Sequence, residues 1–265
     1  MPALEARGVE LSWRESGEGA PVLLVHETTT SSSVWGPVAG SLSPGARAIV
    51  YDRRGWGDSS VPDGYRRTTI EEQSEDAAVL LESLDARPAV VCGAGLGAVI
   101  ALDLLLRRPE LLSGAVLIEP PVIGLVPEAT EALSDDRLAL EEAYRDRRAD
   151  GAVGLYLSGG LQVLSAEADR LPTSLTADAR ERPPILFAEL GCAAGWTMPL
   201  VRLAGAEVPS LIVTAPSTPP LISAAAEALA VRLSASATKD VETTHGPPHI
   251  GAPGAVAELA LGLAN

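Results

Sequence analysis

Aromatic side chains are scarce in this sequence, where Phe, Trp and Tyr make up 3% of 265 residues. The core must therefore be packed mainly from Leu, Val, Ile and Ala, and each of the four tryptophans is a candidate for a special role. Basic residues are also few, with 20 Lys and Arg against 35 Asp and Glu, for a formal net charge of −15. This charge disfavours partners such as nucleic acid or an anionic membrane surface.

Cysteine and histidine are rare as well. The two cysteines, Cys92 and Cys192, lie far apart in the sequence, which favours free thiols over a disulfide and predicts a cytoplasmic protein. Three histidines and two cysteines without ligand spacing indicate no metal site, and we expect no cofactor. The N-terminus has no signal-peptide pattern, and no apolar run reaches the roughly 18 residues that a membrane-spanning helix needs.

Short apolar runs and helical patterns alternate along much of the chain, which predicts α/β architecture with a mostly parallel sheet flanked by helices. The alternation stops after Pro120, where acidic helical segments are interrupted by Gly and Pro. We therefore expect a core domain formed by residues 1–120 and 207–265. Residues 121–206 would form a helical lid inserted into that core.

The chain is organised around residues 90–100, which are typical of a buried strand, a sharp glycine-rich turn and an apolar helix. The turn, Gly93-Ala94-Gly95-Leu96-Gly97, has the frame of the nucleophile elbow G-x-S-x-G, with glycine in place of serine. A glycine at position 95 also suits the unusual backbone of such a turn. A turn with an unstrained backbone and no catalytic role is therefore the alternative to a catalytic site at this position.

Four separated motifs together resemble the α/β-hydrolase family. They are the pair His26-Glu27 after a buried strand, the loop 51–59, the elbow 93–97, and the segment 245–249 before the final helix. The resemblance implies an eight-stranded sheet and a catalytic histidine at His249. It also implies an oxyanion hole formed by the backbone N–H groups of Leu96 and Thr28.

The sequence departs from the pattern of this family at three places. Gly95 supplies no nucleophile, Glu27 replaces a glycine, and the loop 214–219 has no carboxylate where the family places its acid. Glu119 is the nearest substitute and is expected to orient His249. His26, by the same resemblance, is expected to be structural.

Glu27 is the most informative of these departures. A carboxylate beside an oxyanion hole opposes ester hydrolysis because it repels the negative charge that develops there. A partly buried carboxylate with a raised pKa would instead serve as a general acid or base. An outward, solvated side chain is the alternative for this residue.

The leading hypothesis is an enzyme that forms no covalent intermediate, with His249 as general base above Gly95. Water addition, epoxide opening, elimination, cyclisation and rearrangement all fit this arrangement. The expected partner is a small, apolar or aromatic, natural-product-like substrate, and a homodimer is compatible with the sequence. Trp35, Trp56, Trp196 and His245 are expected to line the binding pocket.

Three other interpretations remain open at the level of sequence. The chain can be a non-catalytic binding protein that has kept the fold of a hydrolase, or an ordinary serine hydrolase whose nucleophile was mutated to glycine. Residues 93–98 also satisfy G-x-G-x-x-A, with Glu119 about 20 residues further on, as in dinucleotide-binding oxidoreductases. This third interpretation leaves the other motifs unexplained.

Overall fold

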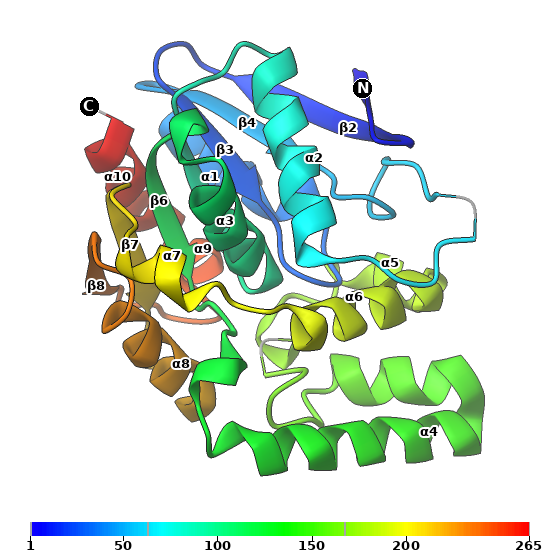
Figure 1. Cartoon of the computed structure of the whole chain (residues 1–265). Helices are drawn as coiled ribbons and strands as arrows, with labels where there is room; N and C mark the ends of the chain where they lie inside the picture. The colour runs from blue at the N-terminus through cyan, green and yellow to red at the C-terminus, as the bar shows by residue number, and fades with distance from the viewer. Residues whose placement is uncertain (1, 63, 167, 265) are drawn as a thin grey trace.

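A computed structural model describes residues 2–62, 64–166 and 168–264 of the chain. Its centre is an eight-stranded sheet in the order β1-β2-β4-β3-β5-β6-β7-β8 (Figure 1). The strands are β1 Ala3–Ala6, β2 Val9–Ser16, β3 Pro21–Val25, β4 Arg47–Tyr51, β5 Ala89–Ala94, β6 Leu112–Ile118, β7 Ser210–Thr214 and β8 Ser236–Asp240. β2 pairs antiparallel with β1 and β4, and the pairs from β4 to β8 are parallel. The predicted mostly parallel α/β sheet is confirmed.

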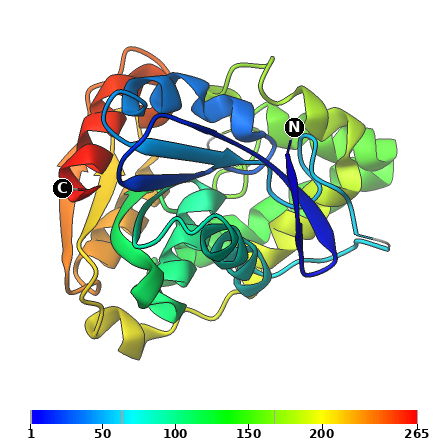
Figure 2. The ribbon, with the colours of Figure 1, turned by 90° about the horizontal axis from the view of Figure 1, so that it is seen from above.

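Helices cover both faces of this sheet, and Figure 2 shows the two layers from above. One core cluster joins the sheet to α2, α3 and α8, while the other joins it to α1 and α10. Because both faces are covered, the inner strands are apolar along their whole length rather than alternating. The elements outside the lid are η1 Ser32–Trp35, α1 Gly36–Leu42, α2 Ile70–Ser83, α3 Leu96–Arg107, η2 Pro109–Leu111, α8 Pro220–Ala230, α9 Pro248–Gly251 and α10 Pro253–Ala264.

Local capping explains where α2 begins but not where α1 does. The Thr69 hydroxyl accepts a hydrogen bond from the Glu72 backbone N–H at 3.0 Å, as expected for an N-cap residue. Ser31 precedes η1, which leads into α1, but its side chain makes no capping bond and contacts the Ser33 hydroxyl at 2.8 Å instead.

The segment between β6 and β7 is largely helical and lies below the sheet in Figure 1. Its longest helix, α4, contains a kink at Arg147 and Arg148, where the backbone leaves helical geometry. Its elements are η3 Ile123–Leu125, α4 Ala129–Leu157, η4 Ala168–Arg170, α5 Ala177–Glu181, α6 Pro183–Gly195 and α7 Leu200–Ala204. We refer to residues 121–206 as the lid segment. No helix in the described part of the chain is long and apolar enough to cross a membrane.

Candidate functional site

The turn between β5 and α3 has the geometry of an elbow. Gly95 adopts φ +51° and ψ −123°, and its N–H donates to the Ile118 carbonyl at 3.0 Å. A Cβ atom on Gly93 would lie 2.2 Å from the Gly97 carbonyl oxygen, and one on Gly97 would lie 2.2 Å from the Val25 carbonyl oxygen. The flanking glycines are therefore required by close backbone packing, whatever residue stands between them.

Glu27 and His249 form a buried pair at this edge of the sheet. Glu27 follows β3 and is 2% exposed, and His249 lies in α9 and is 1% exposed. His249 Nε2 lies 3.1 Å from Glu27 Oε1, whereas Glu27 Oε2 and His249 Nδ1 have no hydrogen-bond partner in the described part of the chain. The Trp35 ring packs against the imidazole, with 4.9 Å between the ring centroids. The solvated alternative for Glu27 is therefore wrong.

Glu119 does not orient His249. Its two carboxylate oxygens accept hydrogen bonds from the Arg170 guanidinium at 2.6 and 2.9 Å and from the Thr218 hydroxyl at 2.6 Å. Arg170 comes from the lid segment, and a charge-assisted, two-pronged bond to a guanidinium is a stronger attachment than a single bond to a neutral imidazole. The expected role of Glu119 is therefore wrong.

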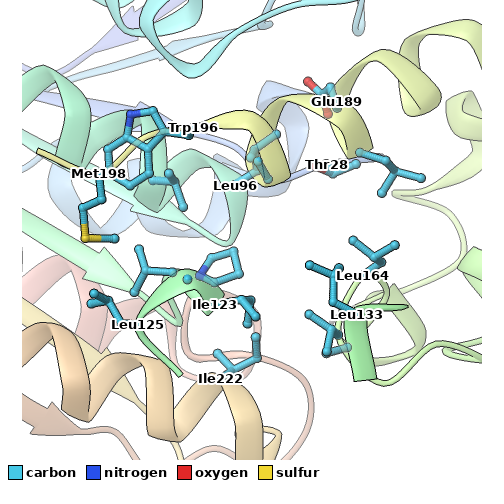
Figure 3. A pocket seen from close by; sticks show the side chains of 18 of the residues that line it. Thr28, Leu96, Ile123, Leu125, Leu133, Leu164, Glu189, Trp196, Met198 and Ile222 are labelled. Carbon is cyan, nitrogen blue, oxygen red and sulfur yellow. The ribbon is translucent and has the colours of Figure 1, made fainter. Parts of the chain in front are cut away.

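A cavity of about 480 Å³ lies between the sheet edge and the lid segment (Figure 3). Thr28 and Leu96 line it, so the two residues assigned to the oxyanion hole connect it to the elbow. Its other walls are largely apolar and include Val99, Val122, Ile123, Leu125, Leu133, Val163, Leu164, Leu171, Leu190, Trp196, Met198, Leu200 and Ile222. Such a cavity suits the apolar part of a small molecule.

Trp196 is the only tryptophan among the described residues that line the cavity. Trp35 packs against His249 instead, and Trp56 is fully buried in an apolar cluster with residues of the lid segment. His245 is exposed and contacts the hydroxyl of Thr244 at 2.9 Å. The expected pocket-lining roles of Trp35, Trp56 and His245 are wrong.

Glu189 of α6, which no sequence pattern marked, is the one charged residue among the described residues that line the cavity. Its carboxylate forms a fully buried ion pair with Arg53, 136 residues away. Arg53 also donates from Nε to the His26 carbonyl at 2.9 Å, and its backbone N–H donates to His26 Nε2 at 2.9 Å. No local pattern marks a pair this distant in sequence.

His26 itself has the structural role expected of it. Its Nδ1–H donates to the Glu27 carbonyl at 2.9 Å, while Nε2 accepts from Arg53. Burial, with a smaller contribution from the Arg53 charge, lowers the pKa of His26 well below its usual value. The neutral ring therefore fixes the strand end from which Glu27 projects.

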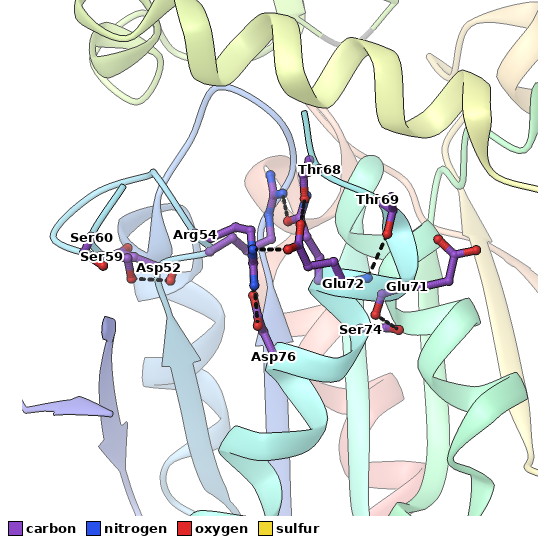
Figure 4. A network of polar contacts seen from close by, with 12 residues as sticks. Asp52, Arg54, Ser59, Ser60, Thr68, Thr69, Glu71, Glu72, Ser74 and Asp76 are labelled. Carbon is purple, nitrogen blue, oxygen red and sulfur yellow. Dashed lines mark hydrogen bonds and ion pairs between the residues drawn. The ribbon is translucent and has the colours of Figure 1, made fainter. Parts of the chain in front are cut away.

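Polar contacts around the loop 52–59 form a second buried network (Figure 4). Asp52 accepts from the backbone N–H groups of Ser32 at 2.7 Å and Asp58 at 2.9 Å. Arg54 donates two 2.7 Å bonds to Asp76 and forms a 2.6 Å ion pair with Glu72. Asp52 thus holds the loop through its carboxylate, whereas Asp58 contributes through its backbone.

Cys92 and Cys192 are both free and buried, as expected from their spacing. Burial raises the pKa of each thiol, so neither is a reactive thiolate near neutral pH. No group of three or more His, Cys, Asp or Glu side chains in the described residues is arranged to hold a metal ion.

Comparison with known proteins places this geometry in a family. BpoC of Mycobacterium tuberculosis, which carries the name of a candidate non-heme bromoperoxidase, is 36% identical over 111 residues, 41% of each chain. YraK of Bacillus subtilis, an uncharacterized hydrolase, is 32% identical over 123 residues, 46% of this chain and 45% of YraK. The matched part thus spans less than half the length of these curated relatives.

The solved structure of Est816, described as an N-acyl homoserine lactone degrading enzyme, superposes with a TM-score of 0.74 at 22% identity. The match covers 98% of this chain and 99% of Est816, and at this identity it establishes the fold alone. The Alpha/beta hydrolase family itself matches residues 22–259. With its sheet order, its elbow and this match over most of its length, the chain belongs to the α/β hydrolase family.

Proposed function

We propose that this protein is an enzyme that transfers a proton on a neutral, largely apolar substrate without forming a covalent intermediate. Glu27 is the general base, and His249 is its hydrogen-bonded partner. The observation that carries this proposal is the 3.1 Å contact between the two buried side chains, next to an elbow that has no nucleophile. Elimination, isomerisation and cyclisation are the reactions that suit it best.

When Glu27 is ionised, His249 Nε2 donates to Glu27 Oε1 and is not available to accept a proton, while His249 Nδ1 has no partner among the described residues. We assign the base to Glu27 because it is the residue by which this chain departs from the pattern of the family. Glu27 Oε2 is buried and has no partner in the described part of the chain. A carboxylate held by one oxygen and unpartnered at the other offers a positioned acceptor for a proton.

The charges also favour proton abstraction by Glu27 over ester hydrolysis by a nucleophile, in which Glu27 would stay ionised beside the developing negative charge. When Glu27 takes a proton from a carbon next to a carbonyl, the C–H electron pair enters the forming enolate and an O–H bond forms on the carboxyl group. Glu27 thereby becomes neutral as negative charge develops on the substrate oxygen. The backbone N–H groups of Leu96 and Thr28, at the wall of the cavity, are the candidates to stabilise that oxygen.

The cavity supports a neutral substrate that is mainly apolar, in keeping with a natural-product-like molecule. Glu189 is its only charged lining residue in the described part of the chain, and the buried Arg53 guanidinium balances that charge. Glu27 and His249 do not line the cavity themselves, and Glu27 adjoins it through its chain neighbour Thr28. A charged substrate body would lose its hydration without gaining an ion-pair partner. The volume lies within the usual range of sites for small molecules.

General-base hydrolysis of a lactone or epoxide is the second candidate. The same carboxylate can activate a water molecule above Gly95, which has no side chain of its own to act as a nucleophile. Est816, which has the same fold, is described as degrading a lactone. In this reaction too Glu27 becomes neutral as it takes the proton of water, so the substrate panel rather than the charges separates the two candidates.

The test is a panel of activated esters, lactones, epoxides and carbonyl compounds with acidic C–H bonds, incubated in D2O and followed by NMR. We expect deuterium exchange or turnover of carbonyl compounds, reduced by about 10²–10⁴-fold in Glu27→Gln and His249→Ala. Glu119→Gln is the matched control, because it neutralises a buried carboxyl group that is bonded to Arg170 instead.

Two outcomes would contradict the proposal. Exchange that survives in Glu27→Gln would remove Glu27 as the base. Ligand binding by all variants without any exchange or turnover would favour the non-catalytic binding protein. Turnover of lactones or epoxides alone, lost in Glu27→Gln, would select the second candidate.

A further inference from the structure

A carboxylate is buried in the middle of α3, a largely apolar helix of the core. Asp103 of α3 is 0% exposed, and every residue from Leu96 to Leu106 is buried with it. An ionised side chain in such surroundings loses its hydration, which costs several kcal/mol unless hydrogen bonds replace it. The side chains that donate hydrogen bonds to Asp103 therefore indicate the role of this residue.

Three side chains from three elements supply those donors. Ser74 of α2 donates to Oδ2 at 2.5 Å, and Arg107, one turn further along α3, donates from Nε to Oδ2 at 2.9 Å. The third donor is the indole Nε1–H of Trp196, which reaches Oδ1 at 2.9 Å. Trp196 belongs to the lid segment, 93 residues away in sequence, so this bond joins the lid to the helix that follows the elbow.

The same indole forms part of the cavity wall. Trp196 lines the cavity, and Figure 3 places it beside Met198, on the same side of the cavity. Its ring is half-buried and packs against the core. Rotation of the ring would break the bond to Asp103 and leave Oδ1 of this buried carboxylate with only the 3.1 Å bond from Arg107 Nε. The loss of a donor to a buried charge costs more than the loss of an ordinary hydrogen bond. The indole is therefore held in one orientation.

We propose that Asp103 determines the shape specificity of this site by fixing Trp196 as a flat, rigid wall of the cavity. The fixed wall favours flat aromatic ligands, which stack on an indole face, over linear alkyl chains of similar size. This inference rests on the proposed function in one respect, namely that the cavity takes the apolar part of the substrate. Asp103 is a positioning residue, since it acts through Trp196.

The experiment measures ligand shape selectivity without any turnover. The probe is the neutral, flat fluorophore N-phenyl-1-naphthylamine, and 1-decanol is the linear competitor that displaces it. In Trp196→Phe and Asp103→Leu we expect affinity for the fluorophore to fall about tenfold, equivalent to about 1.4 kcal/mol, with affinity for decanol changed less than about twofold. Asp103→Asn keeps an acceptor of the same shape and should retain most of the selectivity.

Trp56→Phe is the matched control. It is the same substitution at a fully buried tryptophan that lies outside the cavity lining and whose Nε1 has no partner among the described residues. We expect Trp56→Phe to leave the ratio of the two affinities unchanged. Chemical denaturation of each variant shows whether a change in binding follows from lost stability.

Selectivity that is unchanged in Trp196→Phe, or shifted equally by Trp56→Phe, would overturn the inference. So would a wild-type protein that binds neither ligand. If Asp103→Leu does not fold, Trp196→Phe and Asp103→Asn still decide the question. A failure of the proposed function is separate, because loss of the reaction assigned to Glu27 is measured by deuterium exchange and leaves this binding assay intact.

Discussion

Two buried clusters of charge lie at the same edge of the sheet, and they differ in how completely their atoms are paired. In the network of the loop 52–59, Arg54 is bonded to both oxygens of Asp76 and to Glu72. In the second cluster Glu27 meets His249 through one atom of each side chain, and a buried oxygen and nitrogen are left over. Buried polar atoms are normally satisfied, so atoms left over suggest a partner from outside the chain.

Burial alone does not separate the two clusters, because Arg54 and Glu27 are each only 2% exposed. The saturated network holds a loop in place, since each of its bonds joins parts of the same chain. The pair Glu27–His249 leaves acceptor capacity next to an elbow and a cavity. This contrast supports a structural role for the Arg54 network and the proposed chemical role for Glu27 and His249, and each prediction below tests it.

The largest expected effect is on stability, at Asp76. Asp76→Ala leaves the buried Arg54 guanidinium without its two-pronged partner, and we expect the free energy of unfolding to fall by about 3–5 kcal/mol. Glu27→Gln should change it by less than about 1 kcal/mol, because an amide can still accept the bond from His249. Urea denaturation of both variants measures the contrast, and equal losses would erase the distinction between the clusters.

The next effect concerns Gly95→Ser, which supplies the missing nucleophile. The backbone at this position has φ +51°, so a serine should cost about 1–3 kcal/mol of stability. We expect no ester hydrolysis from this variant alone, because His249 Nε2 is bonded to Glu27. With p-nitrophenyl acetate as the substrate, p-nitrophenol release measures hydrolysis, and the mass of the protein shows whether an acyl-enzyme forms.

The double variant Gly95→Ser with Glu27→Gly frees His249 and should form a detectable acyl-enzyme from p-nitrophenyl acetate. Efficient hydrolysis by Gly95→Ser alone would instead support the interpretation that the chain is an ordinary serine hydrolase lacking its nucleophile. This outcome would also show that Glu27 does not block the histidine.

The smallest effect is a dependence of stability on pH at His26. Its pKa is lowered in the folded protein, so the unfolded chain takes up a proton first as the pH falls below about 6.5. This contribution to stability is complete above that pH and is lost toward the lower folded pKa, by up to about 1.4 kcal/mol per pH unit. His26→Gln should show a shallower slope in denaturation experiments between pH 6.5 and 5.5. Identical slopes would contradict the assignment.

The predictions that the structure contradicts share one cause. Glu119 is the nearest substitute for the carboxylate that the loop 214–219 lacks, but Arg170 of the lid segment binds it instead. Trp56 was assigned to the pocket because tryptophans are rare here, but it packs into a separate cluster under the lid segment. In each case the deciding partner lies far away in the sequence, so no local pattern reports it.

The sequence by itself determined the strand and helix alternation, the turn at Gly95 and the order of the family motifs. These follow from side-chain periodicity and from backbone limits that act over a few residues. Only the tertiary structure decided that Glu27 faces His249, 222 residues away, and that Asp103 holds Trp196. Hydrogen-bond partners are chosen by which elements pack together, and packing is a property of the whole fold.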